Sequence, residues 1–170
     1  MHRTCVAALG AAVLAVAGCG GSDDATPAST ADGAPAAAQP LTKAQFVAQA
    51  DAICRAVKRD HKPYADKVDA LPRGSDLARV APLLEATLQR SRRGLARLRA
   101  LRAPAEDEAA LEAYYAAAQR VLEAHAQLAD AARANDRPAG NKVARATAAL
   151  SRDEQRRASA YGLTDCTDVF

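Results

Sequence analysis

Apolar residues recur at three- and four-residue steps in four stretches between Leu41 and Leu163, and this repeat constrains the fold more than any other feature. Such spacing places apolar side chains along one face of a helix and leaves the opposite face polar. Proline, glycine and asparagine separate the stretches at residues 71–75, 103–104 and 135–138. Four amphipathic helices of about 20 to 30 residues joined by short turns predict an all-α fold, an antiparallel up-down-up-down four-helix bundle.

The first helix has a clear start. Thr42 is a good N-cap, and Gln45 three residues later completes a capping box. We expect this helix to run to about Asp69, with Pro63 as the place for a bend because proline removes a backbone hydrogen bond. Its inward residues are expected to be Phe46, Ala50, Ile53, Val57, Tyr64 and Val68, with Cys54 beside them.

Similar signals mark the other three helices. The second begins at Asp76 or, more firmly, at Pro82, and the third opens at Pro104. The segment 135–138 breaks the third helix, and the fourth ends at Gly162, which suits a left-handed cap. The expected inward residues are Val80, Leu84, Leu88, Leu95 and Leu98, then Leu111, Tyr115, Ala118, Leu122, His125 and Ala129, and finally Val143, Ala146, Leu150 and Ala158.

A short apolar segment precedes the helices. Val6–Ala17 is shorter than the roughly 20 residues that a membrane-spanning helix needs. It leads into Gly18-Cys19, and together these residues resemble a bacterial lipobox, in which the cysteine thiol receives a diacylglycerol. This interpretation predicts a lipoprotein signal peptide at residues 1–18, lipidation of Cys19, and anchoring at the extracytoplasmic face of the cell membrane. The alternative is an ordinary secretory signal peptide, with Cys19 an incidental thiol.

The residues after Cys19 predict a tether and then one domain. Residues 20–40 are rich in Ala, Pro, Gly and Ser and hold no large apolar side chain, so we expect a flexible linker. Residues 41–170 are long enough for one helical bundle domain. Removal of the signal peptide takes away Arg3 and no acidic residue, so the net charge falls from +3 to +2. A charge this small does not indicate a nucleic-acid partner.

Of the four cysteines, Cys5 lies in the signal peptide and Cys19 is the lipidation candidate. Cys54 and Cys166 remain, and pairing is the usual state of two thiols in an exported domain. The tail after Gly162 is long enough to fold back along the first helix and reach Cys54. We therefore expect one disulfide that closes the bundle.

The two ends of the domain also carry a resemblance. Residues 41–46 leading into 50–54, and the ending Tyr161-Gly162-Leu163-Thr164-Asp165-Cys166, look like a group of uncharacterised small helical secreted lipoproteins of high-GC Gram-positive bacteria. The match covers the ends of the domain and extends to its middle only by pattern. It implies a lipid-anchored helical domain with paired terminal cysteines, and it supplies no catalytic residues.

Residue types that carry chemistry are few. His61 and His125 lie on different helices, and the Glu-x-x-His pairs of di-iron bundles are absent because Lys58 and Leu122 stand at the glutamate positions. We expect His125 to be a core or boundary residue and His61 to lie at the surface. No serine has a plausible His and acid nearby in sequence terms, so we expect no catalytic residues, no metal, no cofactor and no enzyme activity.

Arg90, Arg93 and Arg97 share one helix face by their spacing. One interpretation is a basic surface that docks on anionic lipid headgroups or wall polymers. The other is a solvated face whose cations complement the end of the helix, which we favour because the arginines flank a leucine stripe.

Two functions remain. The first is a non-catalytic binding or interaction module of the cell envelope, anchored to the membrane and contacting an envelope protein or wall polymer. The alternative is a carrier that holds a small apolar ligand or lipid in the bundle core, with Tyr64, Tyr114 and Tyr115 as candidate lining residues.

Overall fold

Four α-helices and two short 3₁₀ helices make up most of the computed structural model, which describes residues 39–72 and 74–170. The predicted signal peptide, Cys19 and nearly all of the predicted tether lie outside these residues. The described part contains no β-strand, which confirms the all-α prediction. In chain order the elements are α1 (Lys43–Asp69), η1 (Leu77–Arg79), α2 (Ala81–Arg99), η2 (Ala105–Asp107), α3 (Glu108–Arg133) and α4 (Arg137–Tyr161).

The helix ends follow the local sequence signals. The backbone N–H of Gln45 donates to the Thr42 hydroxyl, and the Gln45 side chain accepts from the Thr42 N–H, so the predicted capping box at the start of α1 is confirmed. The helix continues through Pro63. Gly162 adopts a φ of 101° and caps α4, because a left-handed conformation costs glycine little. The side chain of Asp136 accepts from the Ala139 N–H and so caps the start of α4.

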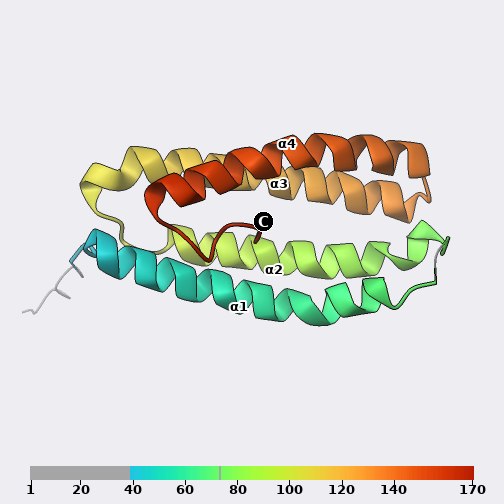
Figure 1. The fold of residues 1–170 in the computed structure, drawn as a ribbon, viewed down its shortest axis with the longest axis horizontal. Helices are drawn as coiled ribbons and strands as arrows, with labels where there is room; N and C mark the ends of the chain where they lie inside the picture. Colours follow the sequence, from blue (N-terminus) through green and yellow to red (C-terminus); the bar gives the residue numbers. More distant parts are fainter. Residues whose placement is uncertain (1–38, 73) are drawn as a thin grey trace, which may run out of the picture. The chain divides into compact units, whose positions relative to one another are not determined.

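Figure 1 shows each helix running back alongside the one before it. The neighbours in sequence pack extensively on one another, α1 with α2, α2 with α3, and α3 with α4. The first and last helices touch where the rings of Phe46 and Tyr161 pack edge to face, with their centroids 5.8 Å apart. Among the described helices, none is long and apolar enough to cross a membrane.

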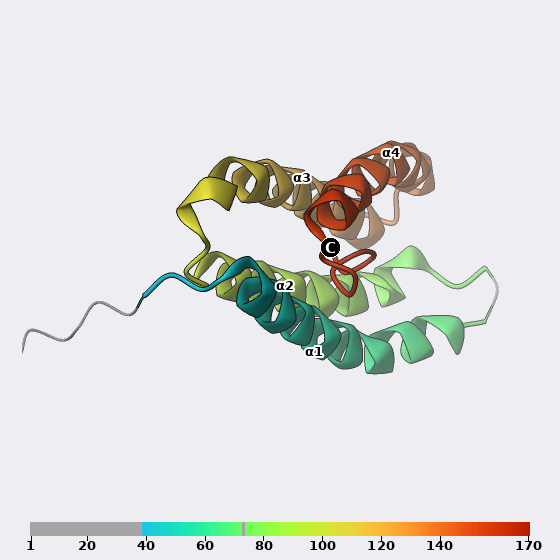
Figure 2. The same cartoon turned by 60° about the vertical axis from the view of Figure 1, so that its left-hand side comes forward.

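The C-terminal segment, residues 162–170, lies between α1 and α4 (Figure 2). It is held on α1 by the Cys54–Cys166 disulfide, whose Cα atoms are 5.0 Å apart, and this confirms the predicted bond. The segment also fills space in the bundle, because Leu163, Val169 and Phe170 are buried. The bundle is therefore closed between its first and last helices by the chain's own end.

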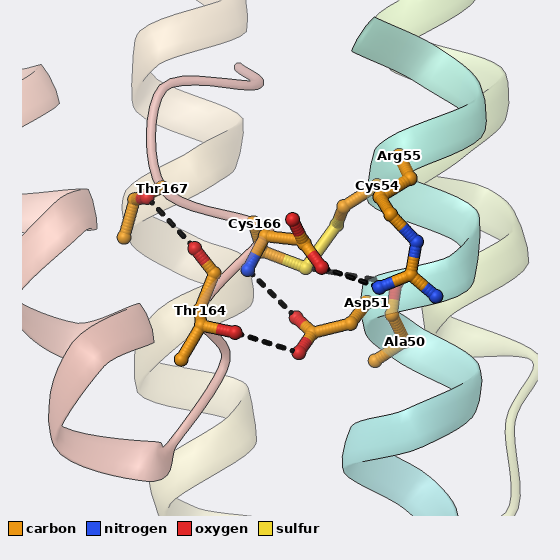
Figure 3. A network of polar contacts seen from close by, with 8 residues as sticks. Ala50, Asp51, Cys54, Arg55, Thr164, Cys166 and Thr167 are labelled. Atoms are coloured by element: carbon orange, nitrogen blue, oxygen red, sulfur yellow. Dashed lines mark hydrogen bonds and ion pairs between the residues drawn. A yellow bond between two sulfur atoms is a disulfide. The ribbon is translucent and has the colours of Figure 1, made fainter.

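A buried carboxylate fixes the start of this segment. Asp51 on α1 accepts a hydrogen bond from the Thr164 hydroxyl at 3.0 Å and another from the Asp165 N–H at 2.9 Å (Figure 3). Arg55, one turn farther along α1, forms an ion pair with Asp165. Hydrogen bonds to a charged acceptor are stronger than neutral ones. The disulfide and this network therefore hold the same short stretch of the tail.

The inward face of α4 differs from the prediction. Of the expected residues, Ala158 is buried, Val143 and Leu150 are half-buried, and Ala146 is exposed. The buried positions include Thr147 and Glu154. The expectation for Ala146 was wrong because the apolar repeat does not reveal a helix face whose inward positions include polar side chains.

Candidate ligand-binding cavity

A cavity of about 360 Å³ lies between the C-terminal half of α1, the N-terminal half of α2, α3 and the end of the chain. Its volume falls within the range of small-molecule sites, roughly 300 to 1,000 Å³. The tail contributes one wall, since Val169 and Phe170 both line the cavity. Its apolar lining residues are Ala65, Val68, Leu83, Leu84, Leu88, Val169 and Phe170.

Polar side chains from three helices face the same space. His61 and Tyr64 come from α1, Thr87 and Ser91 from α2, and His125 from α3. The Ser91 hydroxyl lies 3.2 Å from Nε2 of His61, and it also donates to the carbonyl of Val169 at 3.4 Å. These contacts join α1, α2 and the tail at the inner end of the cavity.

Burial keeps both imidazoles in their neutral form. It lowers the pKa of His61, and nearby Arg90 adds to that effect against an opposing influence of the Thr87 backbone. Burial likewise lowers the pKa of His125, which the positive form of His61 would lower further. The two rings thus present uncharged hydrogen-bonding groups to the cavity near neutral pH.

Apart from the two imidazoles, the described lining of the cavity holds acidic but no basic side chains. Asp69 and Asp168 line it, and no lysine or arginine does so within the described part of the chain. Arg90 is not a lining residue but lies beside one, since its guanidinium is 4.2 Å from the centroid of the Tyr64 ring and donates to the Tyr64 hydroxyl and to the Ala86 carbonyl. A negatively charged group would therefore find no cationic partner in the cavity lining.

The contact between Ser91 and His61 corrects the expectation that His61 lies at the surface, and among the described residues it places a histidine, though no acid, beside a serine. His61 is half-buried and its ring faces a nearly buried hydroxyl. The arrangement lacks the third member of a hydrolase triad, since no hydrogen bond or ion pair joins His61 to a carboxylate in the described residues. Ser91 also lies inside α2, where backbone N–H groups form the helix and cannot serve as an oxyanion hole.

The other predicted site residues are spread over the molecule. Cys19 lies outside the described residues. Arg93 and Arg97 are exposed on α2, whereas Arg90 is half-buried against Tyr64, so the three arginines do not form one free surface. No group of three or more metal-ligating side chains is arranged around a common point in residues 39–72 and 74–170.

The three tyrosines proposed as lining residues occupy different places. Tyr64 lines the cavity, whereas Tyr115 borders a separate hollow near Gln39 and donates to the Leu98 carbonyl at 3.2 Å. Tyr114 is fully buried in the core. Of the three tyrosines proposed from the sequence, Tyr64 alone lines this cavity.

A second cluster was not anticipated at all. Glu154 on α4 is completely buried, and among the described residues neither its carboxyl oxygens nor the Tyr114 hydroxyl has a hydrogen-bond partner. Burial raises the pKa of Glu154 to about 8, and the Asp168 carboxylate adds to this effect, while Tyr114 and Lys58 oppose it. Burial also raises the pKa of Tyr114, with Glu154 contributing. Burial therefore favours the neutral form of both groups near neutral pH.

Comparisons with known proteins assign no family or function to this chain. No protein-family model, curated protein or solved structure matches this chain. The cavity is lined by several elements and combines apolar walls with converging polar groups, which is the usual arrangement of a small-molecule site.

Proposed function

We propose that this chain is a lipid-anchored lipoprotein of the cell envelope, whose helical domain is a non-catalytic binding module held outside the membrane. The observation that carries the proposal is Cys19 at the end of a small-residue site behind the apolar run Val6–Ala17. The disulfide between Cys54 and Cys166 supports it, because such bonds persist in oxidising compartments outside the cytoplasm. Its partners in this proposal are the membrane, through the lipid, and an envelope protein or wall polymer.

The anchor is tested by fractionation and mass spectrometry of the full-length protein. A diacylglyceryl group carries two acyl chains, and at about 0.8 kcal/mol per buried methylene two chains give stable anchoring. We expect the wild-type protein to stay in the membrane fraction at high salt and to carry the lipid mass on Cys19. Cys19→Ala should be released, whereas the matched variant Cys5→Ala should remain bound. Firm membrane attachment of Cys19→Ala would refute the proposal.

The cavity favours a second candidate function, a carrier of a small apolar ligand. Its volume of about 360 Å³, apolar walls and three converging helices support this candidate. Native mass spectrometry of gently extracted protein tests it, with the denatured protein as the control. Extra mass of a few hundred daltons that is lost on denaturation would support a carrier. Native and denatured masses that agree, together with no thermal stabilisation by lipid extracts, would contradict it.

A further inference from the structure

We propose that the cavity between α1, α2, α3 and the C-terminal tail selects a neutral organic molecule with an apolar body and one hydrogen-bonding group. That group would lie at Ser91 and His61, and the apolar body would contact the leucine and phenylalanine walls. The proposal rests on the carrier function and names its ligand class. It is independent of the lipid anchor.

The size and walls of the cavity call for an apolar body. A volume of about 360 Å³ corresponds to roughly a dozen water molecules in the liquid. Water needs two to four polar partners, and half of the lining residues have apolar side chains that offer none. Protein interiors are otherwise close-packed, so an apolar molecule that fills this space gains the dispersion contacts that the walls now lack.

The polar groups of the cavity argue for a neutral ligand. Its inner end holds the Ser91 hydroxyl and the ring of His61. The burial that favours the neutral form of His61 would also disfavour a charged ligand group beside it. Asp69 lines the same cavity and would repel a carboxylate, phosphate or sulfonate, whereas the Asp168 carboxylate accepts a hydrogen bond from Gln155 on α4. Within the described lining, no lysine or arginine offsets that repulsion.

One hydrogen-bonding group fits the contacts at the inner end. The Ser91 hydroxyl is 3.4 Å from the Val169 carbonyl, longer than the usual 2.7–2.8 Å of an O–H···O bond, and 3.2 Å from Nε2 of His61, at the upper end of the 2.7–3.2 Å range for hydrogen bonds between nitrogen and oxygen. Exchanging one of these long contacts for a bond to the ligand therefore loses little. His125 forms no hydrogen bond within the described residues and supplies a second uncharged group nearby.

Two dyes with the same skeleton test the proposal. N-phenyl-1-naphthylamine is neutral, apolar and carries a single N–H, and 8-anilino-1-naphthalenesulfonate adds one sulfonate to it. We would titrate each dye into the full chain carrying Cys19→Ser, without detergent, and follow fluorescence. The neutral dye should bind at least about tenfold more tightly than the sulfonate, which is about 1.4 kcal/mol.

Matched tryptophan variants locate the binding site. Ala65 is exposed on α1 and lines the cavity, so Ala65→Trp should fill it and weaken binding of the neutral dye about tenfold or more. Ala48 is an exposed alanine of the same helix outside the cavity, and Ala48→Trp should leave the affinity unchanged. Circular dichroism and thermal melting verify that both variants fold.

Three results would overturn the proposal: no binding of the neutral dye, equal affinity for the two dyes, or unchanged affinity in folded Ala65→Trp. None of them bears on membrane attachment, which depends on Cys19. Extra mass in native spectra together with failure of the dyes would uphold the carrier function and refute a neutral, singly hydrogen-bonding molecule as its ligand.

Discussion

Glu154→Gln is expected to stabilise the domain at neutral pH and to change its stability little near pH 4. The carboxyl group is fully buried on α4 without a hydrogen-bond partner, and burial raises its pKa from 4.5 to about 8. A group whose pKa is higher in the folded state favours folding below its unfolded pKa, and this advantage is lost as the pH rises toward the folded pKa. The wild-type protein should therefore lose stability between pH 4.5 and 8, whereas the glutamine variant lacks this ionisation.

The expected difference follows from the two pKa values. At pH 7 the linkage amounts to about 3 kcal/mol in favour of the variant, as an upper figure. Urea denaturation of both proteins at pH 4.5, 5.5, 6.5 and 7.5, with the disulfide intact, measures it as a widening gap between the two midpoints. Asp153→Asn is the matched control, because Arg157 and Arg156 lower the pKa of that neighbouring half-buried carboxyl and its removal should not stabilise the protein. A gap that stays constant across this pH range would refute the reasoning.

Three further substitutions test other parts of the structure. A Cβ at Gly94 would lie 2.5 Å from a methyl of Val57, so Gly94→Ala should destabilise the domain by about 1–3 kcal/mol in urea denaturation. A Cβ at Gly140 would come no closer than 3.9 Å to the side chains packed against it, so in the same assay Gly140→Ala should be neutral or stabilise the domain by up to about 1 kcal/mol. Asp51→Ala removes two hydrogen bonds to the tail and should cost about 1–3 kcal/mol, with faster amide exchange in the tail as the specific readout. Burial lowers the pKa of His125, so its contribution to stability is lost as the pH falls below 6.5, and the stability of His125→Gln relative to the wild type should rise as the pH falls from 7.5 to 5 in thermal melts.

The parts of the fold that sequence could predict are those with local signals. Thr42 and Gln45 form the expected capping box, and Gly162 ends α4 because few other residues accept its positive φ. The Cys54–Cys166 bond followed from counting the thiols that remain in the domain. Each of these predictions depends on residues close in sequence or on a pairing with few alternatives.

The cavity depended on information that the sequence does not display. Ser91 and His61 lie thirty residues apart on different helices, and only the register between α1 and α2 brings them together. Val169 and Phe170 belong to a short segment without periodicity, so nothing local indicated that they are buried. Glu154 was missed for a related reason, because a carboxyl at an inward helix position is the opposite of what burial patterns lead one to expect.

The disulfide should also determine whether the cavity keeps its shape. Cys166 is bonded to α1, and Val169 and Phe170, which follow it closely, form one wall of the cavity. A chain with Cys54→Ser and Cys166→Ser frees that wall, so it should bind N-phenyl-1-naphthylamine about tenfold more weakly than the oxidised protein. Hydrogen exchange of residues 163–170 shows whether the tail has left its place while the four helices stay folded. An unchanged affinity in a folded double variant would contradict this prediction, and it would mean that Asp51 and the packing of Phe170 hold the wall without the covalent bond.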